Sequence, residues 1–173
     1  DLTKVDESIT RFQAAIDRVP DHAEARYRLA ELHLLRYRVR AAEQLKEAIG
    51  ADDEIIWQFT SPLSLHRRCH ELKEQSAASL AELREQPLIR QDLVPAVQNL
   101  LAARRSCPLM SKVHFGLAEL FIALPEKDAL QLDEINLVQT AVQLAPNDPE
   151  VLFRAGLLDW QAGRDATARA EWR

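Results

Sequence analysis

The sequence has few of the residues from which catalytic, membrane-spanning or disulfide-stabilised proteins are built. Only 4 of its 173 residues are glycine, and it contains no phosphate-binding glycine-rich loop, nucleophile elbow or His-Glu-x-x-His pair. Two cysteines, Cys69 and Cys107, make no disulfide framework. No apolar run approaches the roughly 20 residues that cross a bilayer. We therefore expect a soluble, non-enzymatic segment that needs no cofactor and does not itself insert into a membrane.

An excess of positive charge is also missing. The formal net charge is -5, which argues against nucleic acid as a partner. Local basic clusters at 36–40, 67–68 and 104–105 lie within or beside helical segments, where solvated faces are typical. The start shows no basic segment followed by an apolar one, as a secretory signal would. Because the first residue is Asp1 and the single methionine is Met110, we expect a fragment or processed product of a larger protein.

Alanine, leucine, glutamate, glutamine and arginine are plentiful, and these residues favour helix over sheet. Near the end of the chain, the small pair Ala155-Gly156 allows a neighbouring helix to approach closely. Gly163 opens a turn between two helices, and Ala168 is followed four residues later by Trp172. This spacing predicts a helical hairpin of the kind that stacks into repeat arrays.

The same spacing recurs along the chain. Pro20 stands where a first helix should stop, and Leu29-Ala30 is the close-packing pair of the next hairpin. We expect that hairpin to turn at 36–38, although the turn lacks the usual glycine, and to continue as a second helix from Ala41. Other packing positions are Ser8, Phe12, Ala15, Leu45, Ala48, Ala96, Leu100, Ala103, His114, Leu117, Ala118, Phe121, Val138 and Ala141. Both ends of the chain cut a helical pair, so further repeats of the parent are expected beyond it.

Residues 52–91 do not follow the repeat. Thr60-Ser61-Pro62 has the character of a helix start, and a long helix is expected from Leu63 to a point before Pro87. The segment is either a degenerate, enlarged repeat or an insertion packed on the array.

These residues give the chain a resemblance to the tetratricopeptide-repeat (TPR) family, from Val5 to Ala48 and from Val94 to the end. The resemblance implies one domain over residues 1–173. Its fold would be an all-α, right-handed helical solenoid of about four to five hairpins. It also implies a protein-binding scaffold in which the first helices line a concave groove.

Groove positions carried over from the family are aromatic at the same place in three repeats: Tyr27, Phe115 and Phe153. The expected partner-binding residues are Tyr27, Glu31, Leu34, Phe115, Glu119, Phe153 and Trp160. Such a groove would be apolar with an acidic bias, suited to a hydrophobic or basic segment of a protein or peptide. Core packing of these aromatics is the alternative. The Lys and Asn residues with which some family members clamp a terminal carboxylate are replaced here, so that function is not expected.

A second resemblance connects the runs 57–68, 103–109 and 114–120 with soluble tails of bacterial O-antigen ligase or polymerase-like membrane proteins. It implies a regulatory tail on the periplasmic side of an envelope glycan enzyme, as an alternative to a free-standing scaffold.

One cluster has metal-ligand spacing: His66, Cys69 and His70 share a helix face and could reach one zinc ion. A fourth ligand is not evident, and Cys69 lies on the apolar stripe. A buried thiol and two ordinary histidines are therefore the favoured interpretation, and a metal site is a lesser alternative. His33 and His114 fall on packing positions and are expected in or near the core.

Overall fold

The computed structural model describes residues 2–49, 85–120, 134–161 and 163–172. Within these ranges the chain forms helices and no strand, which confirms the predicted all-α class. The elements are α1 (Leu2–Arg18), α2 (Ala23–Ile49), the π-helix η1 (Ile89–Leu93), α6 (Val94–Ser106), α7 (Ser111–Glu119), α9 (Glu134–Leu144), α10 (Pro149–Gln161) and α11 (Asp165–Glu171).

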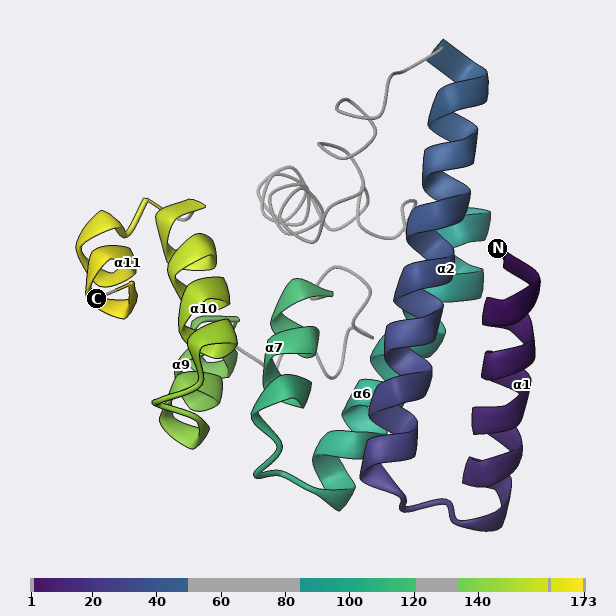
Figure 1. Ribbon diagram of the computed structural model, residues 1–173, viewed down its shortest axis with the longest axis horizontal. Helices are drawn as coiled ribbons and strands as arrows, with labels where there is room; N and C mark the ends of the chain where they lie inside the picture. The colour runs from purple at the N-terminus through teal and green to yellow at the C-terminus, as the bar shows by residue number, and fades with distance from the viewer. Residues whose placement is uncertain (1, 50–84, 121–133, 162, 173) are drawn as a thin grey trace.

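The helices are arranged as an array in which each packs mainly against its neighbours. α2 lies between α1 and α6, α6 packs against α7, and α7 packs against α9. α10 and α11 then pair at the far end, so the two termini lie at opposite ends of the array (Figure 1). This is a helical solenoid, as the repeat spacing predicted.

The core runs along the array as one cluster of buried side chains from α2 to α10. Alanines at the closest helix crossings, such as Ala96, Ala103 and Ala155, are fully buried. Larger side chains, including Leu93, Leu100, Phe115, Leu117, Leu137 and Leu158, fill the spaces between helices. A smaller cluster of Ile16, Ala25 and Leu29 joins α1 to α2.

The predicted C-terminal hairpin is confirmed. A Cβ atom added to Gly156 would lie 2.1 Å from the indole Nε1 of Trp172, so only glycine leaves room for this ring. Gly163 has a φ of +72° in the turn between α10 and α11, a conformation that glycine adopts without strain. Asp148 caps α10, because its carboxylate accepts a hydrogen bond from the backbone N–H of Glu150 at 3.0 Å.

The predicted turn at 36–38 is wrong. α2 is a single helix of 27 residues, and it passes through this segment without interruption. No glycine or proline occurs between Ala23 and Ile49, and arginine, leucine, alanine and glutamate all favour continued helix. Tyr37 is buried in the core cluster, which also fixes the helix at this point.

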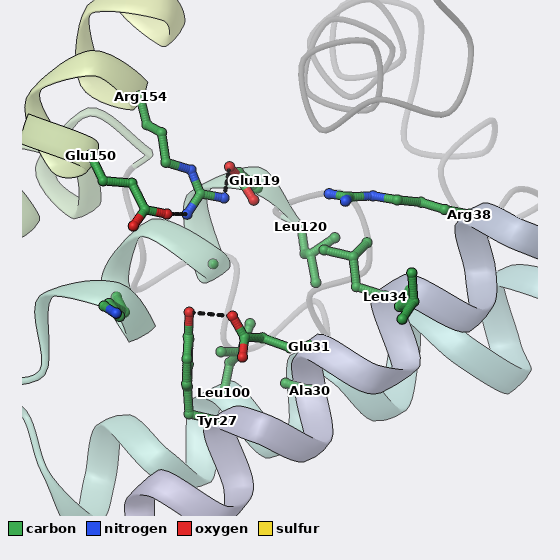
Figure 2. A pocket seen from close by; sticks show the side chains of 13 residues that line it. Tyr27, Ala30, Glu31, Leu34, Arg38, Leu100, Glu119, Leu120, Glu150 and Arg154 are labelled. Atoms are coloured by element: carbon green, nitrogen blue, oxygen red, sulfur yellow. Dashed lines mark hydrogen bonds and ion pairs between the residues drawn. The ribbon is translucent and has the colours of Figure 1, made fainter. Parts of the chain in front are cut away.

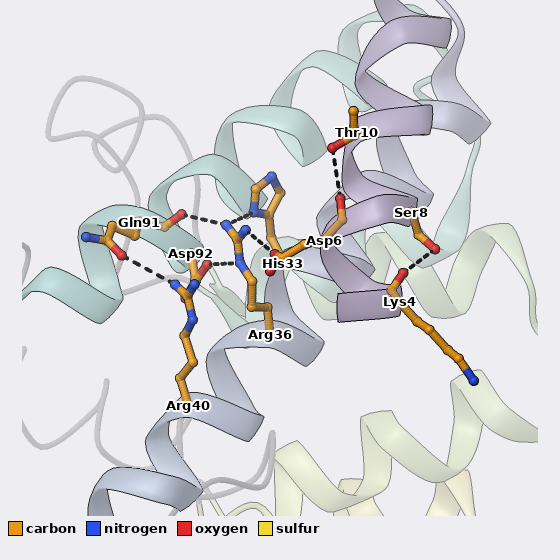
Figure 3. A network of polar contacts seen from close by, with 9 residues as sticks. All are labelled: Lys4, Asp6, Ser8, Thr10, His33, Arg36, Arg40, Gln91 and Asp92. Carbon is orange, nitrogen blue, oxygen red and sulfur yellow. Dashed lines mark hydrogen bonds and ion pairs between the residues drawn. The ribbon is translucent and has the colours of Figure 1, made fainter. Parts of the chain in front are cut away.

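Two arginines of α2 hold it to η1 through a buried carboxylate, and one of them also holds it to α1 (Figure 3). Asp92 in η1 is fully buried, and its carboxylate accepts from Arg36 Nε at 2.6 Å and from Arg40 Nη1 at 3.4 Å. Arg36 Nη1 also donates to Asp6 of α1 at 2.8 Å. The network therefore ties α1, α2 and η1 together.

Candidate partner-binding groove

A concave pocket of about 200 Å³ lies between α2, α6, α7 and α10 (Figure 2). Its apolar wall comes from the aliphatic side chains of α2, from Leu100 of α6 and from Leu120, which follows α7. Charged side chains of α2, α7 and α10 stand around this wall. The lining residues are Tyr27, Ala30, Glu31, Leu34, Leu35, Arg38, Leu100, Lys112, Gly116, Glu119, Leu120, Glu150 and Arg154.

The structure brings four of the expected partner-binding residues together at this pocket. Tyr27, Glu31 and Leu34 reach it from successive turns of α2, and Glu119 reaches it from the end of α7. Phe115, Phe153 and Trp160 do not line it.

Phe115 lies in the core rather than on the groove surface. Its side chain is 1% exposed, and the guanidinium of Arg154 lies 5.3 Å from the centre of its ring. The expectation that Phe115 would present its ring to a partner is therefore corrected: this residue supports the groove from beneath. The alternative of core packing, which the sequence left open, describes it.

Tyr27 forms part of the pocket wall. It is only 6% exposed, and its hydroxyl donates a hydrogen bond to Glu31 Oε1 at 2.7 Å. Burial raises the pKa of Tyr27, and the neighbouring Glu31 raises it further. The phenol therefore stays protonated and keeps Glu31 in place.

The carboxylates of the pocket already have cationic or hydroxyl partners within the chain. Besides the Tyr27 hydroxyl, Glu31 contacts Arg28 Nη1 at 2.8 Å. Arg154 of α10 contacts the buried Glu119 at 2.5 Å and Glu150 at 3.6 Å. The acidic bias expected from sequence is thus largely neutralised, which reduces the support for a basic partner.

Arg38 is one of the pocket residues that sequence reasoning missed, together with Leu120 and Arg154. It is half-buried, and its Nε is buried without a hydrogen-bond partner. Burial lowers the pKa of Arg38, an effect opposed by the charge of Glu119 and reinforced by that of Arg154. The signal that could have revealed it was the lack of glycine or proline at 36–38, because only a continuous helix carries Arg38 to the pocket.

An exposed apolar stripe runs along α10. Phe153 and Trp160 are 56% and 55% exposed, and the partly buried Leu157 lies between them at helical spacing. Glu150 starts the same stripe and also lines the pocket, so the stripe continues the pocket along α10. The indole N–H of Trp172 donates to the Phe153 carbonyl oxygen at 3.2 Å, which holds α11 against this helix.

The three residues with metal-ligand spacing, His66, Cys69 and His70, lie outside the described residues. In the part of the chain that is described, no group of three metal-ligating side chains comes together. His33 and His114 are both buried, as expected from their packing positions. His114 Nε2 lies 2.7 Å from the Pro108 carbonyl oxygen, and since that oxygen can only accept, Nε2 carries the proton.

The tetratricopeptide-repeat family matches residues 1–54, a segment that contains α1 and α2. No curated protein matches the chain. None of the described helices has the length and apolarity to span a membrane.

The fold is therefore a TPR-like helical solenoid. Repeats of this family are generally protein-interaction modules without catalytic activity, and this is the class of function that the match indicates.

Proposed function

We propose that this chain is an interaction module that binds a peptide or a partner helix along the groove formed by the pocket and the α10 stripe. The observation that carries the proposal is the exposure of Phe153 and Trp160 on a stripe that starts at the pocket. Large aromatic side chains are enriched among the residues that dominate binding energy, and two of them on one helix face offer a pair of anchors.

In this arrangement the partner lays an apolar face over Phe153, Leu157 and Trp160. Its end then extends toward the pocket wall of Tyr27 and Leu34. Recognition of a helix or extended segment in a groove needs anchors at intervals of about one to two turns, which the spacing from Phe153 to Trp160 provides.

The test is a selection of random 12-residue peptides displayed on phage against the purified chain, followed by fluorescence polarisation of the selected peptides. Phe153→Ala and Trp160→Ala should each weaken binding about tenfold or more, because truncation of an anchor typically costs about 2 kcal/mol. Both side chains are more than half exposed, so far-UV circular dichroism and the melting temperature should change little.

Leu109→Ala provides the matched control. Leu109 is an exposed large apolar residue that does not line the pocket, and its truncation should leave binding unchanged. Equal binding by all three variants would show that the peptides bind elsewhere.

The alternative of a regulatory tail of an envelope glycan ligase or polymerase concerns the parent protein, and with it the compartment. One of the three runs on which it depends, 57–68, lies outside the described residues. No contact among the described residues favours it over a scaffold. Apolar membrane spans upstream of this segment in the parent polypeptide would support it, and a parent without them would remove it.

A further inference from the structure

We propose that the partner segment carries an acidic side chain and that Arg38 receives its carboxylate in the pocket. This inference rests on the proposed function and names the chemistry of the partner at one point of the groove.

The balance of charges around the pocket supports an acidic group. Glu119 and Glu150 share Arg154, and Glu31 is held by Arg28 and the Tyr27 hydroxyl. Arg38 and Lys112 have no ion pair with any of these carboxylates. Among the described pocket residues, the charged side chains without an ion pair are thus two cations, one in the wall and one on the exposed rim, and Glu119 acts on Arg38 only from a distance.

Arg38 lies where its guanidinium could bind a carboxylate in the pocket. Figure 2 shows its side chain reaching from α2 past Leu34 toward Leu120 and Glu119. Its Nε is a buried N–H without an acceptor, and a donor in this state destabilises the fold. A carboxylate can accept from two N–H groups at the end of the guanidinium at once, which would neutralise its charge.

The size and lining of the pocket fit a side chain rather than a larger anion. About 200 Å³ is smaller than the roughly 300–1,000 Å³ of ordinary small-molecule sites. Its aliphatic wall, which includes Ala30, Leu34 and Leu100, suits the methylene groups of a glutamate. The pocket is also continuous with the α10 stripe, so the acidic residue would lie beside the apolar face of the same partner segment.

The inference is tested with the peptides selected from the random 12-residue library, resynthesised with amidated C-termini. Acidic residues should be enriched at one position, and Glu→Gln at that position should weaken binding to the wild-type chain about tenfold. Arg38→Gln should erase the difference between the Glu and Gln peptides. Arg105→Gln, which changes an exposed arginine that does not line the pocket, should preserve it.

Each other outcome is decisive. If peptides bind but Gln or Lys serves as well as Glu, Arg38 does not receive a carboxylate, whereas groove binding stands. If binding requires a free C-terminus, the carboxylate is terminal and the assignment to a side chain is overturned. If no peptide binds the wild-type chain, the proposed function and this inference fail together. An unchanged melting temperature of Arg38→Gln would show that its loss of discrimination comes from lost recognition and not from unfolding.

Discussion

Three arginines on one stretch of α2 have opposite surroundings on two sides of the helix. On the side of η1, Arg36 and Arg40 hold the fully buried Asp92. On the side of the pocket, Arg38 is half-buried, and its Nε has no hydrogen-bond partner. Residues four apart share a helix face and residues two apart do not, so one sequence run supplies both surfaces. The paired arginines stabilise the array, whereas the unpaired one is available to a ligand.

The largest effect is expected from breaking the paired side. Asp92→Ala leaves two arginines near a buried site without their carboxylate, and it should lower the free energy of unfolding by about 3–5 kcal/mol. Urea denaturation measures this change. Arg38→Met, on the unpaired side, should change stability by less than about 1 kcal/mol or increase it, since it removes an unsatisfied donor. Similar losses of unfolding free energy in both variants would contradict the contrast between the paired arginines and the unpaired Arg38.

A smaller effect is expected at the pair that joins α7 to α10. Arg154→Met keeps most of the packing over Phe115 but removes the cation from the buried Glu119. We expect a loss of about 1–3 kcal/mol in the free energy of unfolding, measured by the same denaturation. Arg28→Met removes two exposed ion pairs, with Glu24 and Glu31, and should cost less than about 1 kcal/mol. An equal loss in the two variants would show that burial of an ion pair does not determine how much it contributes to stability.

The C-terminal hairpin also contains one paired and one unpaired charged group, in this case two carboxyl groups. Asp159 is paired with Arg164, whereas Glu171 Oε2 is buried without a hydrogen-bond partner. Burial, together with the charge of Asp159, raises the pKa of Glu171 to about 7. The folded state therefore binds this proton more tightly than the unfolded state, and stability decreases as pH rises from about 4.5 through 7.

Glu171→Gln should remove that dependence. Between pH 5 and pH 8 the wild-type chain should lose on the order of 1 kcal/mol more than the variant, a value reduced by partial exposure to solvent. Thermal denaturation at both pH values measures the difference. A variant whose stability falls as much as that of the wild type would place the titration on another group.

Local signals in the sequence predicted the local structure well. Pro20, Gly163 and the Ala155-Gly156 pair each act through backbone geometry or close packing within a hairpin, and the structure has a turn or a close contact at each. The turn predicted at 36–38 was wrong because its position came from the period of the repeat, whereas the residues at this point favour continued helix.

Burial at the groove could not be read from the repeat. Tyr27, Phe115 and Phe153 occupy the same repeat position, yet they are 6%, 1% and 56% exposed. The difference depends on which helices lie beside each one, and the sequence pattern does not state this. The sequence pattern also does not show which arginine of α2 lacks an ion pair. That depends on the position of Asp92, which accepts hydrogen bonds from Arg36 and Arg40 and not from Arg38.

The unbroken length of α2 has a consequence for the order of folding. A helix of 27 residues is long enough to gain structure from its own backbone hydrogen bonds before it packs, whereas helices below about 12–15 residues depend on their neighbours. The bond from Arg36 to Asp92 joins positions 56 residues apart and must await closure of that loop. We therefore expect α2 to form early and η1 to dock late, so that weakening Asp92 mainly accelerates unfolding.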